Sequence, residues 1–171
     1  TTRGGPEPDV PPTAASARLG ARSTDLALAI RSGDRAAIRL LVADMTATLV
    51  AAGVYGISYQ AIADSTDWTQ AKQLEVLRDM YADLKQALVA DYLGVGGWAE
   101  AARLATRAQD AAFFRTPETR MALDRAGALR GLDADGRAAV ERLTRLTASA
   151  QVQDWSSIDD ALYELLHSIA R

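Results

Sequence analysis

The chain has 171 residues and a formal net charge of −3; 49% of its residues are hydrophobic, 24% are charged, and none is cysteine. This length suits one domain, and the balance of apolar and charged residues excludes a chain that is disordered throughout. The absence of cysteine excludes disulfides, thiolate metal sites and cysteine catalysis within this chain, and the acidic net charge argues against duplex nucleic acid as the main partner.

The first 23 residues are predicted to form an extended arm or tether that is rich in proline and glycine. Proline fixes φ and removes a backbone donor, so a segment with four prolines resists helix formation. An arm with few large apolar side chains cannot order itself by burial, so we expect the domain or a neighbouring chain to hold it. Such a segment also fits an exported lipoprotein just after its anchoring residue, which suggests a lipid tether upstream. Its prolines are candidate partner contacts: Pro6, Pro8, Pro11 and Pro12.

Residues 24–171 are predicted to form a single helical domain. Apolar side chains recur at steps of three and four residues throughout this part, and no convincing alternation of strand type appears. The expected fold class is therefore all-α, an up-and-down bundle of about six to seven helices. In chain order, these helices cover residues 24–32, 35–50, 67–93, 98–108, 117–131, 134–146 and 157–169, with a short segment over 54–64. No apolar run approaches the ~20 residues that cross a bilayer, so no transmembrane segment is expected.

Capping residues and glycines predict several boundaries. Asp34 is a good N-cap, and Thr116 followed by Pro117 combines a capping hydroxyl with a proline at the first helical position. The three glycines within residues 94–97 are expected to end the long helix, because glycine is common just past a helix C-terminus. They also match the GxGxx(G/A) pattern of dinucleotide sites, but no strand precedes them, so we interpret them as a turn between helices.

The polar residues form no recognisable catalytic constellation. His167 is the only histidine and falls on the polar face of its helix, and the GxSxG motif of serine hydrolases does not occur. The segment from Asp133 to Gly136 resembles part of a calcium loop, but Arg142 stands where the bidentate carboxylate is needed, so a helix-capping turn is favoured. We expect no catalytic residue, no metal, no cofactor and no enzymatic activity.

Two segments with aromatic residues are the remaining candidates for a site. The segment GVYGISYQ places Tyr55 and Tyr59 four residues apart, on one face of a helix that glycines interrupt. The segment GGWAEAARLAT places Trp98 against small alanines, and Glu100 can pair with Arg103 and Arg107 on the outer side. Packing at a corner of the bundle is the favoured interpretation, and contact with a ligand or a partner is the alternative.

The same two segments resemble a family of wholly helical bacterial cell-envelope proteins, many of which are predicted lipoproteins. The resemblance consists of the motif GVYG-x-x-Y, followed about 40 residues later by GGW-x-E, and it covers roughly residues 50–115. The matching positions are Gly53, Val54, Tyr55, Gly56, Tyr59, Gly97, Trp98 and Glu100. It implies a helical fold and a periplasmic or cell-envelope location, and it carries over no catalytic residue, since the family has none established.

The charge is distributed unevenly along the chain. Residues 61–100 carry 3 basic and 7 acidic side chains, whereas residues 101–145 carry 9 basic and 6 acidic ones. Such asymmetry can orient docking onto a partner of complementary potential. We therefore predict a non-enzymatic accessory or scaffold subunit that docks on a larger, membrane-associated complex on the envelope side, with a respiratory or photosynthetic assembly as one candidate host.

Two other functions stay open at this point. One is a small-ligand-binding or sensory bundle that uses the aromatic corner as a pocket wall. The other is a carboxylate metalloprotein, for which Glu75, Asp79 and Asp83 would be a starting point because they lie four residues apart. A solvated acidic face is the favoured interpretation of these three residues, since dinuclear carboxylate bundles combine glutamates with a histidine motif that is absent here.

Overall fold

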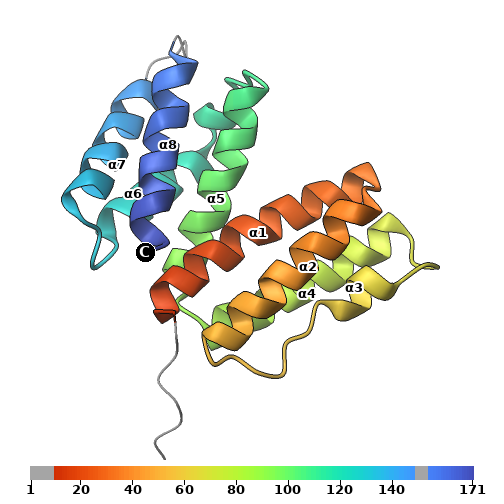
Figure 1. Ribbon diagram of the computed structural model, residues 1–171. Helices are drawn as coiled ribbons and strands as arrows, with labels where there is room; N and C mark the ends of the chain where they lie inside the picture. Colours follow the sequence, from red (N-terminus) through yellow and green to blue (C-terminus); the bar gives the residue numbers. More distant parts are fainter. Residues whose placement is uncertain (1–9, 149–153) are drawn as a thin grey trace, which may run out of the picture.

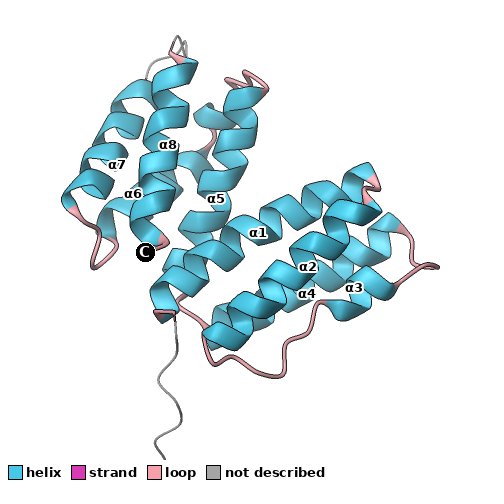
Figure 2. Cartoon of the chain, viewed as in Figure 1, coloured by secondary structure: helices cyan, strands magenta, loops and turns pink. Residues whose placement is uncertain are grey.

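The chain folds into an all-α bundle, as the periodicity predicts (Figures 1 and 2). The structure is a computed structural model that describes residues 10–148 and 154–171. Within these ranges there are eight α-helices, a short 3-10 helix and no strand. The helices are α1 (Pro12–Ser32), α2 (Arg35–Ala51), α3 (Gln60–Asp64), α4 (Gln70–Ala87), α5 (Ala90–Arg107), η1 (Phe113–Arg115), α6 (Pro117–Ala128), α7 (Ala134–Thr147) and α8 (Trp155–Ile169). The short α3, inside the segment expected over 54–64, brings the number above the expected six or seven.

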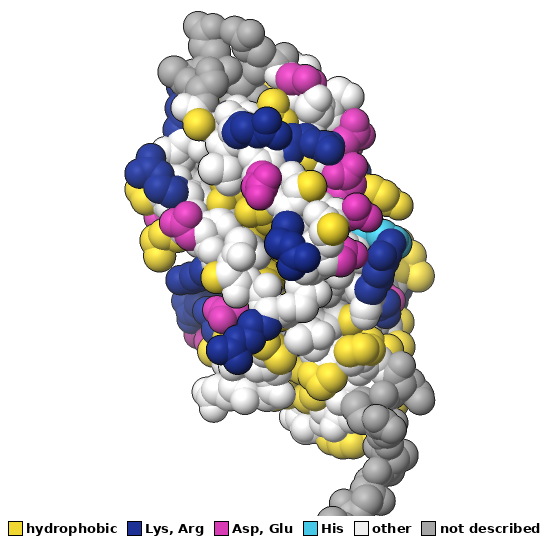
Figure 3. Space-filling view, turned by 90° about the vertical axis from the view of Figure 1, so that its left-hand side faces the viewer, with side chains coloured by type: hydrophobic (Ala, Val, Ile, Leu, Met, Phe, Trp, Pro, Cys, Tyr) yellow, Lys and Arg dark blue, Asp and Glu magenta, His cyan; other side chains and the backbone are white. Residues whose placement is uncertain are grey.

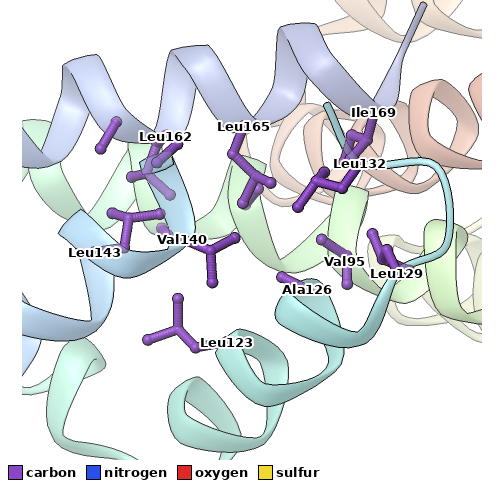
Figure 4. Close-up of a cluster of buried hydrophobic side chains, with 14 of the residues drawn as sticks. Val95, Leu123, Ala126, Leu129, Leu132, Val140, Leu143, Leu162, Leu165 and Ile169 are labelled. Carbon is purple, nitrogen blue, oxygen red and sulfur yellow. The ribbon is translucent and has the colours of Figure 1, made fainter. Parts of the chain in front are cut away.

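The helices form two groups, each with its own hydrophobic core (Figure 1). Helices α1–α4 make up the first half-bundle, and α5–α8 make up the second half-bundle. The first core is built around Leu26, Ile30 and Met45, none of which has measurable exposure. The second core is formed chiefly by leucines and alanines of α5–α8, with Leu143, Leu162 and others pointing into one cluster (Figure 4).

The two half-bundles are joined where α1 crosses α5. A Cβ atom added at Gly20 of α1 would collide with the carbonyl oxygen of Leu93, and one added at Gly96 of α5 would collide with that of Ala17. Backbone therefore packs on backbone, which only glycine permits at this separation. The hydroxyl of Ser16 also accepts a hydrogen bond of 3.0 Å from the backbone N–H of Val89, next to the start of α5.

This crossing corrects the expected boundary at residues 94–97. The glycines do not end a helix, because α5 begins at Ala90 and continues through all three of them. The break between α4 and α5 lies earlier in the chain, at Leu88 and Val89, and both of these residues have extended backbone angles. The expected turn is wrong because glycine has two uses in helical proteins, and here it provides close approach rather than a helix end.

The extended arm expected over residues 1–23 is wrong for residues 12–23, which belong to α1. Pro12 occupies the first helical position, where the missing N–H costs nothing, and Pro11 precedes it with extended angles. Both prolines are exposed. Alanines at the start of α1 are buried, and burial against the rest of the domain orders this segment. The candidate contacts Pro6 and Pro8 lie outside the described residues.

Several predicted caps are confirmed. The carboxylate of Asp34 accepts hydrogen bonds from the backbone N–H groups of Ala36 and Ala37. Thr116 caps α6, which begins with Pro117 as expected.

Within the described ranges, no helix combines the length and the apolar character that crossing a membrane requires.

Candidate functional site

An open apolar groove lies between the two half-bundles, where α1, α4 and α5 meet. It has a volume of about 530 Å³. Its lining residues come from these three helices: Ser23, Thr24, Ala27, Leu28, Arg31, Leu74, Leu77, Arg78, Tyr81, Gly97, Trp98, Ala101 and Leu104. The groove follows from the fold, because α1 belongs to the first half-bundle while α5 begins the second, and the two helices cross at Gly20 and Gly96.

The apolar lining of the groove is incompletely buried. Leu28 of α1 keeps 48% of its surface exposed, and Trp98 and Leu104 of α5 are half-buried. Each side chain belongs to a helix whose core-facing stripe is already occupied by other residues, such as Leu26 and Ile30 in α1. The helices around the groove therefore present a second apolar stripe that no described part of this chain covers.

Two arginines supply the only charged side chains of the lining. Arg31 lies in the last turn of α1 and forms no ion pair within the described ranges. Arg78 of α4 makes a single ion pair, 3.5 Å to Asp79, and both side chains are largely exposed. Because an exposed pair of this kind contributes little stability, Arg78 stays available to an incoming anion.

Trp98 is the predicted site residue that the structure places in the groove. Its indole Nε1–H donates a hydrogen bond of 3.4 Å to the hydroxyl of Thr119 in α6. This bond tethers the ring to α6, and the same residue lines the groove. A tryptophan with one polar tether and an apolar face is the type of residue that dominates many binding surfaces.

Tyr55 and Tyr59 do not share a helix face, so that prediction is wrong. Tyr55 lies in the loop before α3 and is 75% exposed, because the positive φ angles of Gly53 and Gly56 break the helix there. Tyr59 is fully buried at the start of α3, in the first core. Burial raises the pKa of its phenol, and the nearby Ser23 hydroxyl acts in the opposite direction. The phenol oxygen makes no well-formed hydrogen bond among the described residues. Neither tyrosine lines the groove.

Glu100 is buried in α5 rather than lying on an outer side as expected. The predicted pairing with Arg103 is confirmed, at 3.3 Å between Oε2 and Nη1, whereas Glu100 forms no ion pair with Arg107 within the described ranges. Arg103 in turn lies 3.5 Å from a carboxylate oxygen of Asp159 in α8. Burial raises the pKa of Glu100. Glu100 is not part of the groove lining, and its partner Arg103 connects α5 to α8 within the second half-bundle.

A second hollow of about 340 Å³ lies between α7 and α8 and contains His167. The imidazole stacks on Tyr163, with ring centroids 6.2 Å apart, beside both acidic and basic side chains.

Cationic and acidic side chains also alternate over the second half-bundle on the face shown in Figure 3, so no single sign of charge dominates there. Within the described ranges, no group of three or more histidine and carboxylate side chains could hold a metal ion.

The carboxylates that suggested a metal site are engaged elsewhere or exposed. Glu75 pairs with Lys72 at 3.0 Å, and Asp79 pairs with Arg78. Asp83 is exposed on the same helix. These residues form a solvated acidic face of α4, which was the favoured interpretation.

The groove residues other than Trp98 were not recognised as a site from the sequence. A signal was present in α1, where five consecutive apolar residues cover positions 26–30. A helix can turn only about half of such a run toward one core, so some of these side chains had to face another surface. Leu28 is the large residue that does so.

Comparison with models of known families, with curated proteins and with solved structures found no match for this chain. The resemblance to cell-envelope proteins therefore stays a prediction from the two motifs.

Proposed function

We propose that this protein is a non-enzymatic docking subunit that binds a protein partner in the groove between its half-bundles. The observation that carries the proposal is the apolar lining left exposed there, represented by Leu28, Trp98 and Leu104. Exposed apolar side chains that gather in a groove are unfavourable in water, and such groupings can mark interaction sites.

The openness of the groove supports a protein partner over a small ligand. Small-molecule sites usually enclose most of the ligand surface within a cavity of ~300–1,000 Å³. The volume of about 530 Å³ falls in this range, and this observation keeps a ligand-binding function as the second candidate. However, the groove is open along its length, so a bound small molecule would keep much of its surface in water.

The wider setting of the partner is part of the same proposal. The resemblance of the GVYG-x-x-Y and GGW-x-E motifs favours the bacterial cell envelope, and the uneven charge of the chain favours docking on a larger assembly. A membrane-associated complex fits both, with this protein as an accessory subunit on the envelope side.

Native electrophoresis of extracts from the source organism tests the proposal. Wild-type protein is expected to migrate in a complex much larger than its own 18.2 kDa. The substitution Leu28→Asp places a charge in the groove and is expected to release the protein as a monomer. Leu40→Asp is the matched control, since Leu40 is 73% exposed on α2 and lies outside the groove lining.

The outcomes separate docking in the groove from docking elsewhere. If Leu28→Asp leaves the large complex intact while Leu40→Asp disrupts it, the partner binds the α2 face and the proposal fails. If the wild-type protein is monomeric in the extract and copurifies with a stoichiometric small molecule, the ligand-binding function replaces it. Circular dichroism of both variants checks that the helices remain folded.

A further inference from the structure

We infer that the occupant of the groove is an amphipathic α-helix of the partner, with its apolar side on α1 and α5 and carboxylates directed at Arg31 and Arg78. This inference rests on the proposed docking function and specifies the chemistry of the partner. Three features of the groove support it, namely its length, its small residues and its charge.

Each wall of the groove is about two helical turns long. The lining residues run from Thr24 to Arg31 in α1, from Leu74 to Tyr81 in α4 and from Gly97 to Leu104 in α5. Each stretch covers seven residue steps, which corresponds to roughly 10 Å at ~1.5 Å per residue. Helices that bind in grooves use anchors at positions i, i+3 or i+4, and i+7, which cover the same distance.

Small residues allow a helix to approach the groove closely. Ala27 and Ala101 are small residues of the lining, whereas Gly97 packs against the backbone of Gly20 at the crossing. Packed helices have interaxial distances of ~8–10 Å, and small residues at the contact permit the lower end of this range. Leu28, Trp98 and Leu104 can then contact the sides of the incoming helix rather than hold it away.

The charge of the lining specifies the polar part of the partner. Arg31 and Arg78 carry positive charge, and the lining contains no acidic side chain. Arg31 has no ion-pair partner in the described ranges, and the pair of Arg78 with Asp79 is exposed. Arginine presents a planar set of donors that fits a carboxylate in bidentate fashion, so glutamate or aspartate on the partner helix complements this edge.

A fatty acid offers similar chemistry, since it joins an apolar chain to a carboxylate. The open groove favours the helix, because a helix can bring one carboxylate to each of Arg31 and Arg78, whereas a fatty acid has a single carboxylate. A fatty acid is therefore an outcome of the test that would overturn the inference.

A phage-displayed library of random 16-residue peptides tests the occupant directly. The library is selected on immobilised wild-type protein after depletion on the Leu28→Asp variant, and in parallel on the double variant Arg31→Glu, Arg78→Glu. Wild-type protein is expected to enrich peptides with apolar residues at i, i+3 or i+4, and i+7 and with Asp or Glu beside them. The double variant is expected to enrich Lys or Arg at those flanking positions and to bind the wild-type-selected peptides about tenfold more weakly.

The inference is overturned if the enriched peptides lack helical periodicity, or if their flanking charge does not switch in the double variant. It is also overturned if no peptide is enriched, or if dodecanoate binds the wild-type groove with one-to-one stoichiometry and displaces the peptides. Failure of the proposed function is distinguishable from these results. If Leu28→Asp still releases the protein from its native complex, docking in the groove stands and only the helical occupant is wrong.

Discussion

Thr24 of α1 and Gly97 of α5 connect the two half-bundles: the threonine hydroxyl donates a hydrogen bond of 3.0 Å to the glycine carbonyl oxygen. Both residues also line the groove. The crossing of α1 over α5 is therefore continuous with the candidate binding surface, and its packing determines how the groove walls are placed relative to one another. The stability of the crossing and the function of the groove can be tested separately.

Substitution of Gly20 by alanine is expected to destabilise the crossing. The added Cβ would meet the carbonyl oxygen of Leu93, a backbone atom that cannot move without shifting α5. Overpacking of this kind costs about 1–3 kcal/mol or more of unfolding free energy. Gly94→Ala in α5 is the matched control, because a Cβ there meets nothing within 4 Å. That variant is expected to gain up to about 1 kcal/mol from helix propensity.

Urea unfolding followed by circular dichroism measures both glycine variants. Equal stabilities for Gly20→Ala and Gly94→Ala would show that the helices do not approach as closely as the crossing requires.

Substitution of Tyr59 by phenylalanine is expected to leave the stability unchanged or to raise it by about 1 kcal/mol. The buried phenol oxygen makes no well-formed hydrogen bond among the described residues, and its contact with the Ser23 hydroxyl only partly offsets the effect of burial, so its removal relieves a desolvation cost. Tyr81→Phe is the comparison, because the Tyr81 hydroxyl donates a hydrogen bond of 3.4 Å to the carbonyl oxygen of Leu93. That variant is expected to lose about 0.5–1 kcal/mol. A larger loss for Tyr59→Phe than for Tyr81→Phe, measured by thermal unfolding, would contradict this account.

Substitution of Glu100 by glutamine is expected to change how stability depends on pH. The pKa of Glu100 is raised from 4.5, first by burial and then by Asp25, while Arg103 and Arg107 act in the opposite direction. The folded protein thus holds this proton more tightly than the unfolded chain does. The stabilising contribution is complete below the unfolded pKa and is lost as the pH rises through the folded pKa.

The unfolding free energy of Glu100→Gln relative to wild type is therefore expected to increase between about pH 4 and pH 7. Taking the difference at each pH cancels the titration of all other groups to first order. Denaturant titrations at several pH values provide the measurement, and a difference that is constant or that decreases with pH would argue that the Glu100 carboxylate is better solvated than its burial indicates.

Substitution of Trp98 by alanine is expected to weaken partner binding by about tenfold or more, since truncation of a tryptophan anchor commonly costs ~2 kcal/mol of binding free energy. Trp98→Phe retains an aromatic wall and loses only the hydrogen bond to Thr119, so its binding should be close to that of wild type. Fluorescence anisotropy with a labelled peptide from the library selection measures both. Unchanged affinity in Trp98→Ala would place the partner away from the α5 side of the groove.

Local features predicted much of the helical architecture. Asp34 and Thr116 with Pro117 begin helices as their side chains suggest, because a cap satisfies N–H groups within three residues along the chain. The all-α class follows in the same way from apolar residues at steps of three and four. These properties depend on neighbours in sequence, so they can be recognised before the fold is known.

Other local patterns are compatible with two different structures, and only the packing of a neighbouring helix of this chain decided between them. The glycines at 96 and 97 suit a helix end as well as a close crossing, and α1 decides for the crossing because its backbone lies against them. Pro12 suits an extended arm as well as a first helical turn, and burial of the alanines that follow it decides for the helix.

The sequence by itself determined that the chain is helical and where several of its helices begin. Only the tertiary structure decided which apolar side chains stay uncovered, because that depends on how α1, α4 and α5 diverge from the crossing at Gly20 and Gly96. Leu28, Leu74 and Leu104 lie far apart in sequence and line one groove through contacts between helices that no local pattern encodes.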